Sequence, residues 1–311
     1  MLSPLFHLSC PRNLIPAFGK VKSRGHQHEA VDFGMRRRIE RKRLADISVA
    51  QTYRFRNSEA YRRQNTSYQP TRPTPIPTGE RRKPRPQGRP GFLRIDTVHQ
   101  GDRDGVKGIY HIDAVDEVTQ WEIVAATPQI SQHWLIPLLE GLLEQFPFAI
   151  RGFHSDNGSE FINYTVARLL DKLLIEQTKS RARRTGDNGL VECKNGAIIR
   201  KHMGFSHIAA PHAEAVDQFH RQYLNPYLNF HRPCAVAEIV EEPNGKRRRV
   251  YRQWATPFEI FSRMPQCESY LRPGMKMADL EILAKAKSDT EAAIEMQQAK
   301  RQLNSVTKRS A

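Results

Sequence analysis

Long apolar runs and paired cysteines are missing from this chain of 311 residues. Its four cysteines lie far apart and form no CxxC pair, which excludes a cysteine-based zinc site and a disulfide framework and fits a reducing compartment. No apolar stretch approaches the length of a membrane span. Residues 1–18 are faintly similar to a secretory leader, but Pro4, His7 and Pro11 interrupt them and no basic residue precedes the apolar part. We therefore expect a cytoplasmic protein, associated with the nucleoid, that does not contact a membrane.

Acidic residues are scarce at one end of the chain only. Residues 1–90 hold 20 of the 49 Lys and Arg residues and 6 of the 33 Asp and Glu residues, a net charge of +14. The rest of the chain holds 29 basic and 27 acidic residues, a net charge of +2. A basic surplus confined to one segment indicates binding to a polyanion, with a solvated, disordered charge run as the alternative.

Composition divides the chain into four segments. Residues 1–69 form a basic N-terminal segment, in which residues 35–60 fit one or two short helices that would be the remnant of a DNA-binding domain. Residues 70–90 contain seven prolines and are predicted to be an extended linker. Residues 91–235 form the core, and residues 236–311 are predicted to be a hairpin around Asn244-Gly245 followed by helices.

Apolar periodicity in the core predicts an α/β domain. Three strands in succession are followed by a helix with the spacing of a buried stripe, and then strands and helices alternate. This order is typical of a mixed sheet flanked by helices. The predicted strands are 92–99, 107–115, 121–127, 149–154 and 175–178, and the predicted helices are 131–146, 159–174, 212–230 and one that starts near Asp187 or Asn188.

Three carboxylates stand in settings that suit metal ligands. Asp96 lies inside an apolar strand, where a charged group needs a strong reason. Asp156 follows the strand at 149–154, and Glu192 lies just inside a predicted helix start. A hard divalent cation takes a few carboxylate oxygens, which these three elements would supply. Asp113 and Asp116 are rival candidates, for which we expect solvent-exposed or turn-capping roles.

Five stretches of sequence, in this order, resemble motifs of the DDE transposase and retroviral integrase superfamily, in particular of bacterial insertion-sequence transposases. They are LRIDTVHQGD around Asp96, GFHSDNGSEF around Asp156, TGDNGLVECKNG around Glu192, YLNFHRP and ATPFE. A carboxylate triad by itself is weak evidence, but five ordered motifs are specific. The resemblance covers roughly residues 48–265 and implies a ribonuclease-H-like fold.

The resemblance also implies a reaction. The chain is expected to be a polynucleotidyl transferase that cleaves and joins DNA strands with two magnesium or manganese ions, held by Asp96, Asp156 and Glu192. Asp96 would bridge the two ions, because one carboxylate must contact both. Water would first release a 3′-hydroxyl, which would then attack a second phosphodiester, without a general base from the protein. Double-stranded DNA, as element ends and target, and further copies of the chain are the expected partners.

Other residues near the motifs receive lesser roles. His154 and Asn157 are predicted neighbours of the active site, with His154 packing rather than ligating. The residues predicted to contact DNA are Arg183, Arg184, Lys194, Arg200 and Lys201. Two other functions stay open: a catalytically inactive or truncated transposase-derived DNA-binding protein, and a nuclease that only hydrolyses.

Overall fold

The computed structural model describes residues 47–66, 76–182, 184–242 and 245–309. The chain divides into two compact units, Met1–Asn65 and Thr66–Ala311. The described part of the first unit consists of helices α3 (Val49–Asn57) and α4 (Glu59–Gln64). The hydroxyl groups of Ser48 and Ser58 accept hydrogen bonds from the backbone three residues further on, which caps both helices. Residues 35–46 of the predicted basic helices, like the rest of 1–46, lie outside the described residues.

Six strands of the second unit form its central sheet. In spatial order they are β1 (Glu80–Arg81), β8 (Glu176–Lys179), β7 (Gly152–Ser155), β2 (Phe92–His99), β5 (Tyr110–Asp116) and β6 (Glu122–Thr127). The strands β2, β5 and β6 form an antiparallel meander, whereas β7, β8 and β1 add to β2 in parallel. This mixed sheet has the ribonuclease-H-like strand order and is flanked by helices, so the predicted fold class is confirmed.

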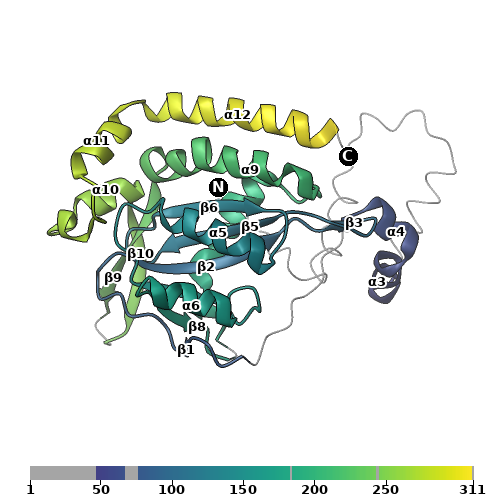
Figure 1. Cartoon of the computed structure of the whole chain (residues 1–311), viewed down its shortest axis with the longest axis horizontal. Helices are drawn as coiled ribbons and strands as arrows, with labels where there is room; N and C mark the ends of the chain where they lie inside the picture. The colour runs from purple at the N-terminus through teal and green to yellow at the C-terminus, as the bar shows by residue number, and fades with distance from the viewer. Residues whose placement is uncertain (1–46, 67–75, 183, 243–244, 310–311) are drawn as a thin grey trace. The chain divides into compact units, whose positions relative to one another are not determined.

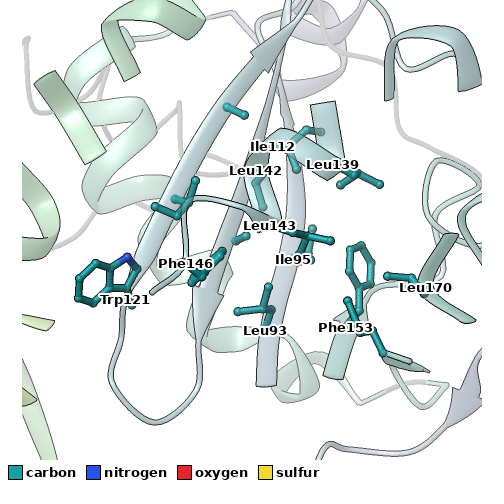
Figure 2. Packing of buried hydrophobic residues seen from close by; sticks show 14 of the residues in the cluster. Leu93, Ile95, Ile112, Trp121, Leu139, Leu142, Leu143, Phe146, Phe153 and Leu170 are labelled. Atoms are coloured by element: carbon teal, nitrogen blue, oxygen red, sulfur yellow. The ribbon is translucent and has the colours of Figure 1, made fainter. Parts of the chain in front are cut away.

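One face of the sheet is apolar. Side chains alternate between the two faces of a strand, so Leu93 and Ile95 of β2 and Ile112 of β5 share one face. Helices α5 (Gln132–Leu143) and α6 (Tyr164–Lys172) add buried leucines and a valine to this layer. Figure 2 shows these side chains meeting in one packed cluster. This cluster is the main hydrophobic core of the second unit.

The opposite face of the sheet carries charged and polar side chains. They include Arg94 and Asp96 of β2, Asp113 of β5 and Glu122 of β6. Two helical segments cover this face and supply a second apolar cluster around it. The first is α7 (Gly189–Lys194), the π-turn segment η3 (Asn195–Arg200) and α8 (Lys201–Met203), and the second is α9 (Ala213–Phe219) with the π-turn segments η5 (His220–Leu224) and η6 (Tyr227–His231).

Side chains of the second helical segment protect the edge strand β6. Asn225 and Asn229 each accept a hydrogen bond from a backbone N–H of β6 and donate one to a backbone carbonyl of the same strand. Asp217 accepts from the N–H of Ala126 at 2.8 Å. An uncovered edge strand invites pairing with another chain, and these side chains satisfy it instead. Asn229 of the YLNFHRP motif therefore has a structural role.

The remaining elements surround this body. The hairpin β9 (Cys234–Glu241) and β10 (Arg247–Ala255) is antiparallel, and residues 243–244 of its predicted turn lie outside the described residues. In the ATPFE motif, Thr256 and Glu259 form a capping box at the start of α10. Figure 1 shows the last helix running alongside α9. The other elements are α10 (Pro257–Ser262), α11 (Met277–Lys285), α12 (Asp289–Arg309), β3 (Asp102–Arg103), β4 (Val106–Lys107), η2 (Thr185–Asp187), η4 (Ala210–His212) and η7 (Cys267–Tyr270).

Two expectations from the sequence need correction. Part of the predicted linker at 70–90 packs onto the sheet: β1 pairs with β8, and Lys179 Nζ donates to the carbonyl of Thr78 at 2.6 Å. The second expectation is the buried stripe of the helix predicted at 131–146: its apolar residue Trp134 is 45% exposed, because α5 turns that position away from the sheet. Among the described residues, the structure contains no helix with the length and apolar character needed to span a membrane.

Candidate active site

Asp96 lies in the middle of β2, on the polar face of the sheet. Its Oδ1 accepts a hydrogen bond from the N–H of Thr97 at 2.9 Å, and its Oδ2 accepts from Nδ2 of Asn195 at 2.6 Å. Burial raises the pKa of Asp96 to about 7, and the nearby negative charges of Asp156 and Glu192 push it in the same direction. The side chain is therefore held in place by two donors and also faces two other carboxylates.

Asp156 follows the last residue of β7 and begins a tight turn. Its Oδ1 accepts from the N–H of Gly158 at 2.8 Å, which fixes the carboxylate at the end of the strand. Asn157 turns the other way and donates to the carbonyl of Ser180 at 3.2 Å. The strand β7 is parallel to β2 and pairs with it directly, so the end of β7 approaches the middle of β2.

Gly91 allows the close approach of these two strands. It precedes β2, has a φ of 99°, and accepts backbone hydrogen bonds from Arg151 and Gly152. A Cβ atom at this position would collide with the carbonyl of Ala149. Only glycine combines this conformation with the contact, so Gly91 supports the register that brings Asp156 near Asp96.

His154 is buried beneath this strand end. Its Nδ1 lies 2.9 Å from Oγ1 of Thr178, and its Nε2 lies 3.3 Å from Oγ of Ser180. Burial, together with the cationic Arg94, lowers the pKa of His154 to about 3, so the ring is neutral at ordinary pH. Both ring nitrogens face hydroxyl groups within the protein, an arrangement suited to packing.

Glu192 lies in the first turn of α7. Asn188 occupies the N-cap position, where its carbonyl accepts from the N–H of Glu192 at 3.2 Å. Its side-chain Nδ2 donates to the carbonyl of Ile95 at 3.1 Å, so the cap residue also joins the helix to β2. This contact brings the start of α7 beside Asp96.

An ionic network holds the loop before α7. Arg181 donates to both carboxylate oxygens of Asp187, at 2.9 and 2.8 Å, which depresses the pKa of Asp187. The buried Arg94 binds Glu117 and also donates to the carbonyl of Asp187 at 2.6 Å. The loop is thereby attached to the sheet immediately before the helix that carries Glu192. Asp187, predicted as a possible helix cap, serves this network instead.

The three predicted carboxylates come from three separate elements. Asp96, Asp156 and Glu192 are near enough for the latter two to act electrostatically on Asp96. In the part of the chain that the structure describes, no group of three His, Cys, Asp or Glu side chains is close enough to hold one metal ion together. Pairs of carboxylates that share Asp96 suffice for magnesium, which takes one or two carboxylates and keeps several waters. The donor chemistry fits a hard divalent cation.

Sequence reasoning missed two residues at this site. Asn195, which binds Asp96, stands three positions after Glu192 and so lies on the same side of the helix, a spacing that could have revealed it. Glu160 lies near Asp156, and burial, together with the negative charge of Asp156, raises its pKa. It adds a fourth carboxyl group beside the three that the motifs indicated.

Asp113 and Asp116 are both fully buried, which corrects the expectation of solvent-exposed roles. Asp116 does cap a turn: its oxygens accept hydrogen bonds from four backbone N–H groups and the hydroxyl of Thr119. Asp113 lies in mid-strand as the register partner of Asp96. Its carboxylate oxygens have no hydrogen-bond partner among the described residues, and burial raises its pKa well above the usual value.

The predicted DNA contacts differ in their surroundings. Arg184 and Lys201 are exposed, whereas Arg183 lies outside the described residues. Lys194 is buried and ion-paired with Glu122, which directs its ammonium group toward the sheet. Arg200 donates to the carbonyl of His99 at 2.9 Å and also to Gln100 and Gly204, which directs its guanidinium toward the protein.

Comparison with known proteins gives limited further information. No protein-family model matches the chain. A curated relative, the uncharacterized protein y4rM of Sinorhizobium fredii (strain NBRC 101917 / NGR234), is 31% identical over 127 residues, which are 40% of this chain. The match spans only 36% of the length of that relative.

Two solved structures are similar at low identity. The catalytic core domain of BIV integrase matches 55% of this chain and 92% of its own, with 17% identity and a TM-score of 0.35. The simian T-cell lymphotropic virus intasome, solved with PP2A regulatory subunit B56 gamma, matches 52% of this chain and 55% of its own chain, with 16% identity and a TM-score of 0.33.

Proposed function

We propose that this chain is a DNA transposase, a polynucleotidyl transferase that cleaves DNA strands and joins them to a target. The observation that supports the proposal is that the charges of Asp156 and Glu192, which come from two other elements, both act on Asp96 on the polar face of the mixed sheet. Carboxylates that repel one another are costly unless a cation accompanies them. Metal-dependent phosphodiester chemistry is the reaction class that uses such a group.

Magnesium or manganese is the cation that these residues would hold. Asp96 would contribute to both of two ions, with Asp156 completing one site and Glu192 the other. Two bound ions would stabilise the attacking and the leaving oxygen of an in-line displacement. Asn195 and the N–H of Thr97 orient the Asp96 carboxylate, and the turn at Gly158 orients Asp156. Such prior orientation lowers the cost of reaching the reactive geometry.

The proposed mechanism requires no side chain of the protein to accept a proton. His154 is neutral, but both of its ring nitrogens face hydroxyl groups within the protein. The role of the chain is therefore to bind the phosphodiester, align it and hold the carboxylates. Water is the first nucleophile, and the 3′-hydroxyl that it releases is the second.

Duplex DNA is the proposed partner, as element ends and as target, bound by further copies of the chain in one complex. Arg54 and Arg56 in the last turn of α3 and Arg62 and Arg63 in α4 give the first unit its basic helices. Neutralising phosphates releases condensed counterions, so binding should weaken steeply with salt. Among residues of the second unit, the exposed Arg184 and Lys201 remain proposed contacts.

The test of DNA binding is a salt titration of the full chain and of a chain that lacks residues 1–65. The boundary is placed there because β1 and Thr78 belong to the sheet of the second unit. The shortened chain should bind a duplex oligonucleotide more weakly and with a flatter dependence of log K on log salt. Equal slopes for both proteins would exclude the basic segment as a DNA contact.

The test of catalysis uses supercoiled plasmid and a linear duplex that carries the inverted repeats flanking the coding region. Magnesium or manganese should support nicking and strand transfer, whereas calcium should support binding with little chemistry, because its looser coordination aligns the attacking oxygen poorly. Activity that persists in excess chelator would refute the proposal. Nicking without joined products would indicate a nuclease, and binding without either would indicate an inactive, transposase-derived DNA-binding protein.

A further inference from the structure

A buried cation lies on the sheet side of the helix that carries Glu192. The side chain of Lys194 is 10% exposed, and its Nζ lies 3.2 Å from Oε2 of Glu122, whose side chain is 1% exposed. Glu122 is the first residue of β6, and Lys194 is the last residue of α7. The ion pair therefore joins the helix to the far strand of the meander.

A second buried acid lies close to the same cation. Asp113 is on β5, between the register partners Asp96 on β2 and Val124 on β6. The positive charge of Lys194 acts on Asp113 as well as on Glu122, and the two acids repel each other. One ammonium group thus stands among two buried carboxylates, and its removal would leave both without their nearest cation.

Stability alone does not explain this arrangement. Removing two charges from water costs several kcal/mol per ion, and well-packed apolar residues of similar volume are often equally stable. Apolar contacts are available here, because Ile198 of the same helical segment packs in one cluster with Val98 and Val124 of the sheet. An apolar interface tolerates small shifts of the helix, whereas the hydrogen bond within this ion pair keeps its strength only over a narrow range of distances and angles.

The ion pair joins the helix to a strand that its other polar contacts with the sheet do not reach. Asn188 binds the carbonyl of Ile95, and Asn195 binds the carboxylate of Asp96, so both of these side chains reach β2. Polar contacts with a single strand leave the orientation of the helix about that strand to apolar packing. Lys194 reaches β6, two strands away in the sheet, and so restricts this rotation.

We propose that the ion pair between Lys194 and Glu122 is a positioning device, which fixes the angle of the helical segment 189–200 on the sheet and so places Glu192 relative to Asp96. Both residues are positioning residues, because they act through Glu192. The consequence for catalysis rests on the proposed function, whereas the positioning of the helix does not.

Hydrogen exchange of the full-length protein, without metal or DNA, tests the positioning directly. The variants are Lys194→Met, Glu122→Gln and the double variant, with Lys285→Met as a matched control from the exposed pair with Glu281. Each single variant leaves a buried charge without its partner and should be destabilised. In the double variant neither member of the pair is left charged without its partner, although Asp113 still loses its nearest cation, so global stability should recover in part relative to Lys194→Met. The amides of 189–200 should still exchange faster than in the wild type. The control should match the wild type.

Plasmid nicking in magnesium then tests the consequence. In the double variant we expect kcat to fall by ~10- to 100-fold with little change in the KM for DNA, because the helix is misplaced by a small distance while the DNA-binding surface is intact. A role limited to stability predicts that the double variant recovers activity along with stability. A lower kcat at an unchanged KM in the stable double variant therefore indicates positioning, whereas recovered activity indicates a role in stability only.

The outcomes separate the two proposals. Wild-type exchange at 189–200 in the double variant would overturn the positioning role, whatever the activity. Wild-type nicking by a double variant with fast exchange would overturn its catalytic consequence. If the unsubstituted chain shows no metal-dependent nicking at all, the proposed function fails, and the exchange result still decides the positioning role. Should both single variants fail to fold, the double variant is sufficient.

Discussion

The two faces of the central sheet bury different kinds of side chain. One face buries leucine, isoleucine and phenylalanine side chains against α5 and α6. The other face buries Arg94, Asp113 and Glu122 and partly buries Asp96 beneath the helices that contain Glu192 and Asn229. Both faces belong to the same strands, so alternation of side chains along each strand produces the difference.

The comparison shows that one face stabilises the fold, whereas the other face lowers its stability. Burial of apolar surface is favourable at every position of the first face. On the second face, burial raises the pKa of Asp96, Asp113 and Glu122, which means that their charged forms are disfavoured there. A fold that keeps such groups has a use for them, and the proposed metal site supplies one.

The largest effect should follow from changing the triad on the polar face. Asp96→Asn, Asp156→Asn and Glu192→Gln each remove an anionic ligand while keeping the shape of the side chain, so strand cleavage and joining should fall by roughly a thousandfold or more. DNA binding and thermal unfolding should change little. Cleavage assays and melting curves on the same preparations check both statements. Near-normal joining by Glu192→Gln would show that the third ligand is assigned wrongly.

The apolar face should show the reverse behaviour. Leu139→Ala leaves a cavity in the layer formed by α5 and the sheet, and should lower the free energy of unfolding by about 2–5 kcal/mol. Cleavage per folded molecule should remain near the wild-type value. Urea denaturation together with activity corrected for the folded fraction measures this. A large loss of activity in a fully folded variant would show that the apolar face also determines activity.

A finer comparison uses two acids of the same strand. Asp116→Asn replaces an acceptor of several hydrogen bonds with a side chain that carries an NH2 group, so it should cost about 1–3 kcal/mol of stability. Asp113→Asn removes a buried ionisable group whose oxygens have no hydrogen-bond partner among the described residues, and should leave stability equal or higher. Both variants should keep far more cleavage activity than the triad variants. Urea denaturation separates them.

Much of the fold follows from the sequence, because apolar alternation and the helical stripe are local signals. The strand at 92–99 matches β2 as the structure has it. The candidate triad followed from motifs whose order is visible along the chain. The surroundings of Asp113 and Lys194 did not follow, since they are buried by the docking of helices far away in sequence. Trp134 shows the same limit, because its exposure depends on how α5 lies against the sheet.

The last prediction concerns a pH dependence of stability that comes from Asp96. Its pKa is raised to about 7 in the folded protein, so between about pH 4 and pH 7 the folded state binds more protons at this site than the unfolded state. Its contribution is therefore fully present below about pH 4 and is lost as pH rises to about 7. Asp96→Asn removes this contribution.

The difference between the two proteins isolates the effect, since other buried acids and histidines titrate in both. In chelator, the melting temperature of the variant minus that of the wild type should increase from pH 4 to pH 7 and then level off. The two hydrogen-bond donors to Asp96 favour its charged form and so oppose part of the rise in its pKa. A difference that stays constant across this range would mean that the pKa of Asp96 is not raised. It would also mean that Asp156 and Glu192 lie too far from Asp96 to affect its ionisation.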